Sequence, residues 1–211
     1  EFLLDCDVTN DDQMDATFAA LEAKWGKIDF LVHAIAFAGK EQLEGSFVDN
    51  TTREGFKSAL DISAYSFVDA ARRASHIMND DGAMVTLTYL GSERVVPNYN
   101  VMGVAKAALE ASMRYIAADL GPRGIRVNAI SAGPIKTLAA AGIGSGRHMF
   151  RFNKAASAMQ DNTDSKGVAG AALYLLSELG LSCTGETHHV DGGFHAIGMP
   201  QEGPLRASLE E

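Results

Sequence analysis

Tyr99 and Lys106 are the two residues whose types and spacing are best suited to chemistry. They lie seven positions apart, at the start of an alanine-rich run of good helix formers. Seven residues correspond to about 700° of helical rotation, so both side chains project from one face of a helix. An ammonium group beside a phenol favours the negative form of whatever the phenol contacts. The pair suits a proton-donating or oxyanion-stabilising site, with a chance coincidence on one helix face as the alternative.

Apolar runs of strand length alternate with helical patterns around this pair. The predicted helices cover residues 11–26, 52–78, 99–120, 150–160 and 164–176. The predicted strands cover residues 1–8, 28–33, 83–88, 125–130 and 185–193. Strands that alternate with helices form a parallel sheet with helices on both faces. The sequence therefore predicts an α/β, doubly wound, Rossmann-like fold in one domain over residues 1–211, since no linker or internal repeat interrupts the pattern.

Charge and composition exclude several classes of function. The net charge of −9 argues against binding to nucleic acid or to an anionic membrane surface. No segment reaches the roughly 18 consecutive apolar residues that a membrane helix needs. Cys6 and Cys183 lie far apart in the sequence, which is typical of a reducing compartment and predicts a cytoplasmic protein. His188 and His189 are adjacent and would face opposite sides of a strand, so no metal site is predicted.

A ligand site is expected where the parallel strands end. Ligands of such sheets bind at the carboxyl ends of the strands. The segments expected there are residues 5–8, 34–37, 88–90, 131–137 and 191–194. Most of them are rich in glycine or other small residues, which lets a flat ligand lie against the backbone. This pattern predicts a nucleotide ligand. The glycines at 142, 144 and 146 do not form a dinucleotide loop, because no strand precedes them.

The segment from Leu87 to Lys106 resembles the enoyl-acyl carrier protein reductases, a branch of the short-chain dehydrogenase/reductase superfamily. Most of that superfamily spaces its catalytic tyrosine and lysine four residues apart, whereas the enoyl reductases use the seven-residue step found here. Residues 33–38, 127–137 and 189–194 resemble the same branch. The resemblance covers nearly the whole chain and implies NADH-dependent reduction of trans-2-enoyl thioesters, carried by acyl carrier protein, in fatty-acid elongation.

The resemblance also implies roles for individual residues. Tyr99 would hydrogen-bond the thioester carbonyl, Lys106 would hold the nicotinamide ribose, and Tyr89 would be the second active-site tyrosine. The implied cofactor contacts are Asp7, Val8, Ile35, Lys106, Ile135, Lys136, Thr137, Leu138 and Ala139. The implied acyl-pocket residues are Phe37, Ala38 and Met102, with a substrate-binding segment within residues 136–160. Purely structural roles stay open as alternatives: Asp7 as a turn former, Tyr89 as a core aromatic, Thr137 as a helix cap, and Phe37 and Met102 as core residues.

The chain departs from the family pattern at its amino-terminal end. It lacks the first strand, the glycine-rich loop, the first helix and the second strand, so the expected sheet has a gap and two unpaired edges. We expect the sequence to be either one part of a longer protein or a truncated chain. NADH is favoured over NADPH only because this branch usually uses it. The family is usually a homotetramer, which predicts packing through the helices at 52–78 and 99–120. The competing hypotheses are another short-chain dehydrogenase, such as a carbonyl reductase, and a truncated non-catalytic subunit.

Overall fold

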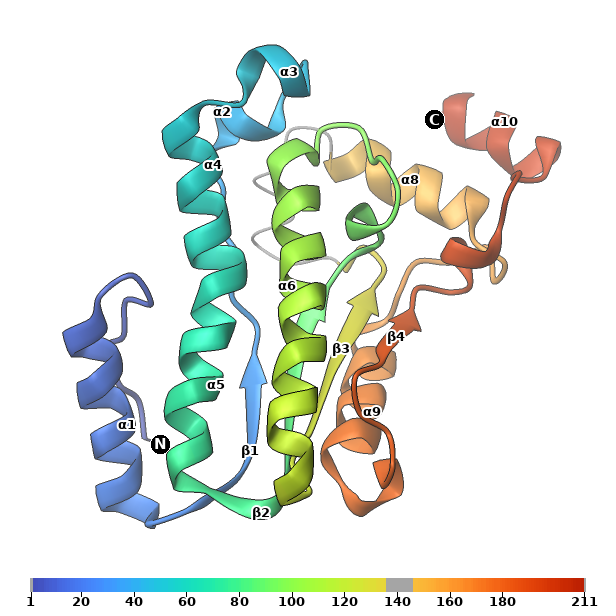
Figure 1. Cartoon of the computed structure of the whole chain (residues 1–211). Coiled ribbons are helices and arrows are strands. Elements are labelled where there is room, and N and C mark those ends of the chain that lie inside the picture. The colour runs from blue at the N-terminus through green and yellow to red at the C-terminus, as the bar shows by residue number, and fades with distance from the viewer. Residues whose placement is uncertain (1, 136–145, 211) are drawn as a thin grey trace.

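The computed structural model describes residues 2–135 and 146–210 (Figure 1). Its helices are α1 (Asp11–Trp25), α2 (Lys40–Leu43), α3 (Phe47–Asn50), α4 (Arg53–Leu60), α5 (Ser66–Ile77), α6 (Asn100–Leu120), α8 (Gly146–Ala156), α9 (Ser165–Leu176) and α10 (Glu202–Glu210). Its strands are β1 (Ile28–His33), β2 (Met78–Thr88), β3 (Arg126–Ala132) and β4 (Thr187–Val190).

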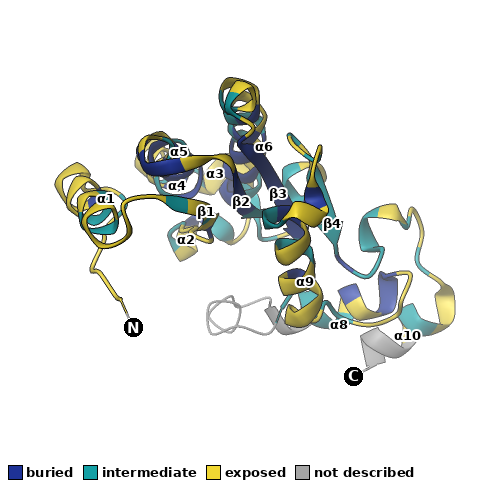
Figure 2. Ribbon diagram, turned by 90° about the horizontal axis from the view of Figure 1, so that it is seen from below, coloured by how far each residue is buried: buried dark blue, intermediate teal, exposed yellow. Residues whose placement is uncertain are grey.

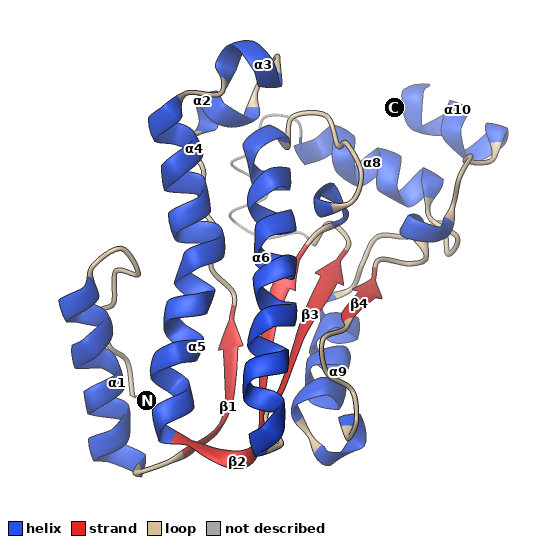
Figure 3. Ribbon diagram, in the orientation of Figure 1, coloured by secondary structure: helices blue, strands red, loops and turns tan. Residues whose placement is uncertain are grey.

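The described strands form one parallel sheet in the order β1-β2-β3-β4 (Figure 3). Because all of them run in one direction, their carboxyl ends meet at one edge of the sheet. Helices cover both faces: α5 and α6 pack on one side and α9 on the other (Figure 2). The predicted α/β, doubly wound architecture is confirmed.

The core is split into two layers by the alternation of side chains along the strands. On β2, the neighbouring residues Met84 and Val85 are both fully buried but belong to opposite layers. Met84 packs in the layer under α5 and α6, with Phe67 and Leu109, whereas Val85 packs in the layer under α9, with Leu175. A strand buried on both faces is typical of a parallel sheet, and it gives the residues at its end a fixed position.

The helix ends follow the capping signals of the sequence. Asn10 accepts a hydrogen bond from the backbone N–H of Gln13 at 3.1 Å, and Gly26 ends α1 with φ +72°. Asp164 caps α9 by accepting from the N–H of Lys166 at 2.9 Å. The predicted helix at 52–78 forms as α4 and α5, joined without a break by a π-helical turn at Asp61–Tyr65.

The predicted strand at residues 1–8 is wrong. Residues 2–7 form no strand, and Phe2, Leu3 and Leu4 are exposed. The apolar pattern suits a strand, but a strand also needs a hydrogen-bonding neighbour, and within residues 2–135 and 146–210 β1 pairs only with β2. β1 is therefore an edge strand, as the expected gap implied, and Phe30 and Val32 on it are exposed.

Other differences are smaller. β2 begins five residues before the predicted strand, at Met78, while the final strand is confined to Thr187–Val190. The carboxyl-terminal residues Glu202–Glu210 form α10, for which no helix was predicted from the sequence. The short helices α2 and α3 were not predicted, because helices of four residues carry no periodic pattern.

Candidate active site

Tyr89 and Tyr99 lie together at the carboxyl end of β2. Tyr89 follows the last residue of β2, and Tyr99 is the residue directly before α6. Their ring centres are 5.0 Å apart in an edge-to-face arrangement. The structure thus brings together the two tyrosines that the sequence singled out, on a rigid strand end and a rigid helix start.

Two glycines permit this close packing. A side chain at Gly91 would lie 2.3 Å from the Tyr99 ring, and one at Gly103 would lie 2.6 Å from the carbonyl oxygen of Gly91. The 3₁₀ turn at Leu90–Ser92 can therefore rest directly on the first turns of α6. Only glycine fits at both positions without moving backbone or ring.

Lys106 lies two turns along α6 from Tyr99, and its side chain is 6% exposed. Its Nζ donates a hydrogen bond to the carbonyl oxygen of Leu87 at 2.7 Å. One turn further on, Glu110 is equally buried and accepts a hydrogen bond from the hydroxyl of Thr88 at 2.5 Å. The last two residues of β2 thus fix both charged side chains of this helix face.

The electrostatics of the site follow from burial. Burial raises the pKa of Tyr99 well above its ordinary value, and the nearby Tyr89 and Glu110 add to the rise. Burial and then the Asp191 carboxylate raise the pKa of Tyr89 to about 12. Burial lowers the pKa of Lys106 to about 8, against the opposing effect of Glu110. At neutral pH the phenols keep their protons, and the ammonium keeps its charge.

A buried histidine, which sequence reasoning did not single out, supports the site from β1. His33 is 3% exposed, and its Nδ1 and Nε2 lie 3.0 Å from Thr86 Oγ1 and 2.8 Å from Ser66 Oγ. The Ser66 hydroxyl donates to the carbonyl oxygen of Ile62 at 2.6 Å, which assigns the proton between Ser66 and the ring to Nε2. Burial and then the Lys106 charge lower the pKa of His33 to about 4, so the ring is neutral.

The π-helical turn positions these supporting groups. Ser63, within it, donates to the carbonyl oxygen of Phe37 at 3.0 Å and lies 2.9 Å from its N–H. Ser66 follows it directly and holds His33. Extra turns of this kind are frequent at functional sites. Their signal in the sequence is weak, because Ser63 and Ser66 read as ordinary helix residues.

The amino-terminal cofactor candidates lie in a turn before α1. The carboxylate of Asp7 accepts hydrogen bonds from the N–H of Thr9 at 2.9 Å and from its hydroxyl at 2.8 Å. These bonds lower the pKa of Asp7, which is exposed. Asp7 thus shapes the turn, its neighbour Val8 is half-buried, and the cofactor contact of both residues stays a prediction. A turn carboxylate of this kind is still free to contact a ligand.

Of the other cofactor candidates, Ile35 and Ile135 follow strand ends, and the rest lie outside the described residues. Ile35 is exposed after β1, and Ile135 is half-buried against the layer under α9. Lys136, Thr137, Leu138 and Ala139 lie outside the described residues, as do residues 140–145 of the expected substrate-binding segment.

The three acyl-pocket candidates differ in burial. Phe37 is exposed, Ala38 is half-buried, and Met102 is buried on α6 with 7% exposure. None of them lines the two pockets around the tyrosines whose walls consist of described residues. Their role in substrate binding therefore stays a prediction.

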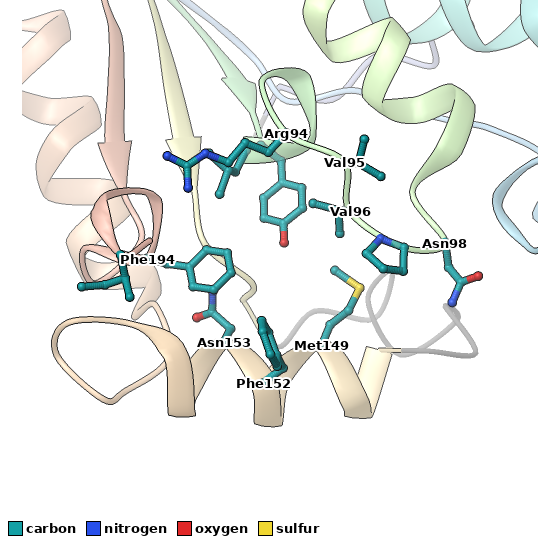
Figure 4. Close-up of a pocket in the computed structure, with 12 residues that line it drawn as sticks. Arg94, Val95, Val96, Asn98, Met149, Phe152, Asn153 and Phe194 are labelled. Atoms are coloured by element: carbon teal, nitrogen blue, oxygen red, sulfur yellow. The ribbon is translucent and has the colours of Figure 1, made fainter. Parts of the chain in front are cut away.

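Tyr89, but not Tyr99, lines a cavity of about 290 Å³. Figure 4 shows Met149, Phe152 and Asn153 rising from α8 toward the loop that carries Val95 and Val96. α8 lies within the substrate-binding segment expected at residues 136–160, but the sequence did not single out its side chains at this cavity, because the cavity forms only when α8 folds against the loop after β2.

Other kinds of site find no support in the described residues. No group of three histidine, cysteine, aspartate or glutamate side chains could hold a metal ion there. His188 lies near Tyr174 while His189 stacks on His195 with ring centres 4.0 Å apart, so the two neighbours face different partners, as predicted. Among the described helices, none combines the length and the apolar character needed to cross a bilayer.

Comparison with known proteins identifies the family. Residues 1–195 match the family model described as enoyl-(acyl carrier protein) reductase. The chain is 58% identical over 194 residues to enoyl-[acyl-carrier-protein] reductase [NADH] 1 of Rhizobium meliloti, covering 92% of this chain and 71% of the relative. It is 49% identical to the enoyl-[acyl-carrier-protein] reductase [NADH] FabI of Escherichia coli, covering 94% of this chain and 76% of the relative.

Solved structures agree with the sequence matches. The crystal structure of the enoyl-(acyl-carrier-protein) reductase of Anaplasma phagocytophilum in complex with NAD superposes with a TM-score of 0.91 and 49% identity, over 95% of this chain and 76% of that one. FabI of Candidatus Liberibacter asiaticus superposes with a TM-score of 0.92 and 44% identity, over 95% of this chain and 78% of that one. The spacing of Tyr99 and Lys106, the fold and these matches agree: the chain belongs to the enoyl-(acyl carrier protein) reductase family.

Proposed function

We propose that this protein is an oxidoreductase that reduces the carbon–carbon double bond of trans-2-enoyl thioesters on acyl carrier protein, with NADH, in fatty-acid synthesis. The observation that carries the proposal is the pair of half-buried tyrosines, Tyr89 and Tyr99, whose rings lie 5.0 Å apart, with the buried Lys106 two turns further along α6. The NADH-dependent enoyl reductases of Rhizobium meliloti and Escherichia coli named above are about half or more identical to this chain and support the same activity.

Tyr99 stabilises the oxygen of the substrate's thioester. NADH, when bound, supplies a hydride to the β-carbon, and negative charge then develops on the thioester oxygen. Because burial raises the pKa of Tyr99, its phenol is protonated at neutral pH and donates a hydrogen bond to that oxygen. Tyr89, with its pKa raised to about 12, is a second protonated phenol beside it. The α-carbon then takes a proton, which completes the reduction.

Lys106 fits the ribose of the cofactor. An ammonium group has three N–H donors, and among the described residues only the carbonyl oxygen of Leu87 accepts a hydrogen bond from it. The remaining donors can hold two ribose hydroxyls. The Lys106 charge also strengthens hydrogen bonds to a negative oxygen, because burial reduces screening by water. We assign Asp7, Val8, Ile35, Ile135 and the stretch 136–139 to the rest of the cofactor, and Phe37, Ala38 and Met102 to the acyl chain.

Acyl carrier protein is the proposed carrier of the substrate, and a homotetramer is the proposed assembly. The α4–α5 and α6 helices offer exposed aromatic residues for packing between copies, such as Tyr65 at 53% and Tyr115 at 78% exposure. We place the protein in the cytoplasm, since Cys6 and Cys183 are both free thiols.

The test follows NADH absorbance at 340 nm with a trans-2-octenoyl thioester. We expect consumption of NADH by the protein, near loss of activity in Tyr99→Phe, and a strong loss in Lys106→Ala. Full activity of Lys106→Ala would show that Lys106 has no role in cofactor binding or catalysis. Turnover of ketones but not of enoyl thioesters would establish a carbonyl reductase instead. Calorimetry that detects no NADH or NAD binding to the folded protein would establish a non-catalytic subunit.

A further inference from the structure

Two asparagines on either side of Tyr99 adopt backbone conformations that few residues tolerate. Asn98 has φ +60° and Asn100 has φ +37°, on the left-handed side of backbone space. Among residues other than glycine, asparagine and aspartate enter this region most readily. Residues held in such conformations cluster at active sites, where the surrounding structure keeps them in place. Two of them beside a tyrosine of the proposed site therefore call for a role.

Asn98 belongs to a turn that fixes the backbone N–H of Tyr99. This N–H donates to the carbonyl oxygen of Val96 at 3.1 Å. Pro97 and Asn98 are the two central residues of the turn. Proline at the first central position and a positive φ at the second are typical of a type II turn. Glycine would serve at the second position as well, because the turn requires only the positive φ there.

Asn100 separates Tyr99 from the helix that follows. It is the first residue of α6, but its positive φ lies far from the helical value of about −63°. The carbonyl oxygen of Tyr99 accepts from the N–H of Met102 at 2.9 Å. The Asn100 Nδ2 donates to the carbonyl oxygen of Gly45 at 3.2 Å, in the loop between α2 and α3. The direction of the Tyr99 side chain is thus set by this corner and not by the helix alone.

We propose that Asn98 and Asn100 are positioning residues, whose left-handed conformations direct the Tyr99 phenol toward the thioester oxygen. The inference rests on the proposed enoyl reduction, in which Tyr99 donates a hydrogen bond to that oxygen. Asn98 acts on the N–H side of the Tyr99 backbone and Asn100 on its carbonyl side. A residue that avoids a positive φ would relax the backbone and turn the Tyr99 ring, which now lies edge-to-face with Tyr89.

Alanine and glycine variants test this role, because alanine disfavours a positive φ and glycine accepts it. With a trans-2-octenoyl thioester and NADH, we expect Asn98→Ala and Asn100→Ala to lower kcat about tenfold and to leave the KM for NADH unchanged. Asn98→Gly should keep nearly the native kcat. Asn100→Gly should fall between the native protein and Asn100→Ala, since it restores the conformation but not the bond to Gly45.

Asp81→Ala is the matched control for the loss of a left-handed residue. Asp81 has φ +65° but lies near the amino end of β2, whereas Tyr89 follows the carboxyl end. Its replacement by alanine should leave kcat unchanged.

Two measurements separate the positioning of Tyr99 from a general structural role. In the Tyr99→Phe background, the alanine variants of Asn98 and Asn100 should not lower the residual kcat any further. NMR of the protein with isotope-labelled tyrosine rings needs no turnover, and the Tyr99 signals are assigned by their loss in Tyr99→Phe. These signals should shift in both alanine variants and stay close to native in Asn98→Gly and Asp81→Ala.

Several results would overturn the proposal. These are an undiminished loss of kcat in the Tyr99→Phe background, an Asn98→Gly variant as slow as Asn98→Ala, or native Tyr99 ring signals in both alanine variants. Asn100→Gly introduces no backbone strain, so a native kcat and native ring signals in it would exclude a role for the bond to Gly45 even if Asn100→Ala did not fold. Failure of the native protein to reduce any enoyl thioester would refute the proposed function instead, and the ring signals would still show whether the asparagines position Tyr99.

Discussion

Replacing Lys106 with methionine should stabilise the protein at neutral pH, and the gain should fade as the pH rises. The pKa of Lys106 falls from 10.5 to about 8 because the side chain is buried. A pKa shift of this size means that burying the charged form destabilises the folded protein by about 3 kcal/mol relative to the unfolded chain. Methionine removes that destabilisation. It also leaves the Leu87 carbonyl oxygen without its hydrogen-bond donor, which destabilises the variant by about 1 kcal/mol or more. We expect a net gain of about 1–2 kcal/mol at pH 7.

The sign of the pH dependence follows from proton binding. Between about pH 8 and pH 10.5 the unfolded chain keeps the proton of Lys106 while the folded protein loses it, so the native protein gains stability as the pH rises. From about pH 8 to pH 9.5 it should gain about 1.5 kcal/mol relative to Lys106→Met, because a difference of one bound proton changes the free energy of unfolding by about 1.4 kcal/mol per pH unit and the folded lysine is still half protonated at pH 8.

Urea unfolding of both proteins across this pH range provides the measurement. Other titrating groups are common to both proteins, so their effects cancel in the difference. Lys57→Met is the control, because Lys57 is an exposed lysine with 64% of its side chain accessible, and its removal should give a difference that stays nearly constant with pH. A constant difference for Lys106→Met, or a variant that is less stable at pH 7, would refute the reasoning.

Two further predictions concern packing. Gly103→Ala should lower kcat at least tenfold and destabilise the fold by about 1–3 kcal/mol, because the new methyl group would lie 2.6 Å from the Gly91 carbonyl oxygen and displace the turn between the tyrosines. Gly170→Ala on α9 is its control, since nothing lies within 4 Å of that position, and it should leave activity unchanged; equal kinetics of the two variants would contradict the account. Arg73→Ala should destabilise by about 3 kcal/mol in urea, because Arg73 joins α1 to α5 through Asp15 at 2.8 Å and pairs with the buried Asp69. A loss below about 1 kcal/mol would show that Arg72, which also reaches Asp69, replaces it.

The sequence predicted the parts of the site that depend on local pattern. The positions of Tyr89, Tyr99 and Lys106 follow from one strand end and one helix. Such features need only the periodicity of one segment.

What the sequence could not predict depends on contacts between distant segments. The bonds of His33 to Ser66 and of Thr88 to Glu110 join residues 33 and 22 positions apart, and neither pair has a local signature. The cavity around Asn153 requires α8 to fold against the loop after β2. The failed strand at residues 1–8 has a similar cause, because an apolar run becomes a strand only beside a partner.

The position of the transferred hydride tests the central claim most directly. The protein is supplied with a trans-2-octenoyl thioester and NADH carrying deuterium at the transferred position, and the product is analysed by NMR. We expect deuterium at the β-carbon, in a ratio of one to each NADH consumed, with the thioester intact. Deuterium at the carbonyl carbon, or no transfer to the enoyl thioester by a protein that binds NADH, would contradict the assignment of Tyr89, Tyr99 and Lys106 to an enoyl reductase site.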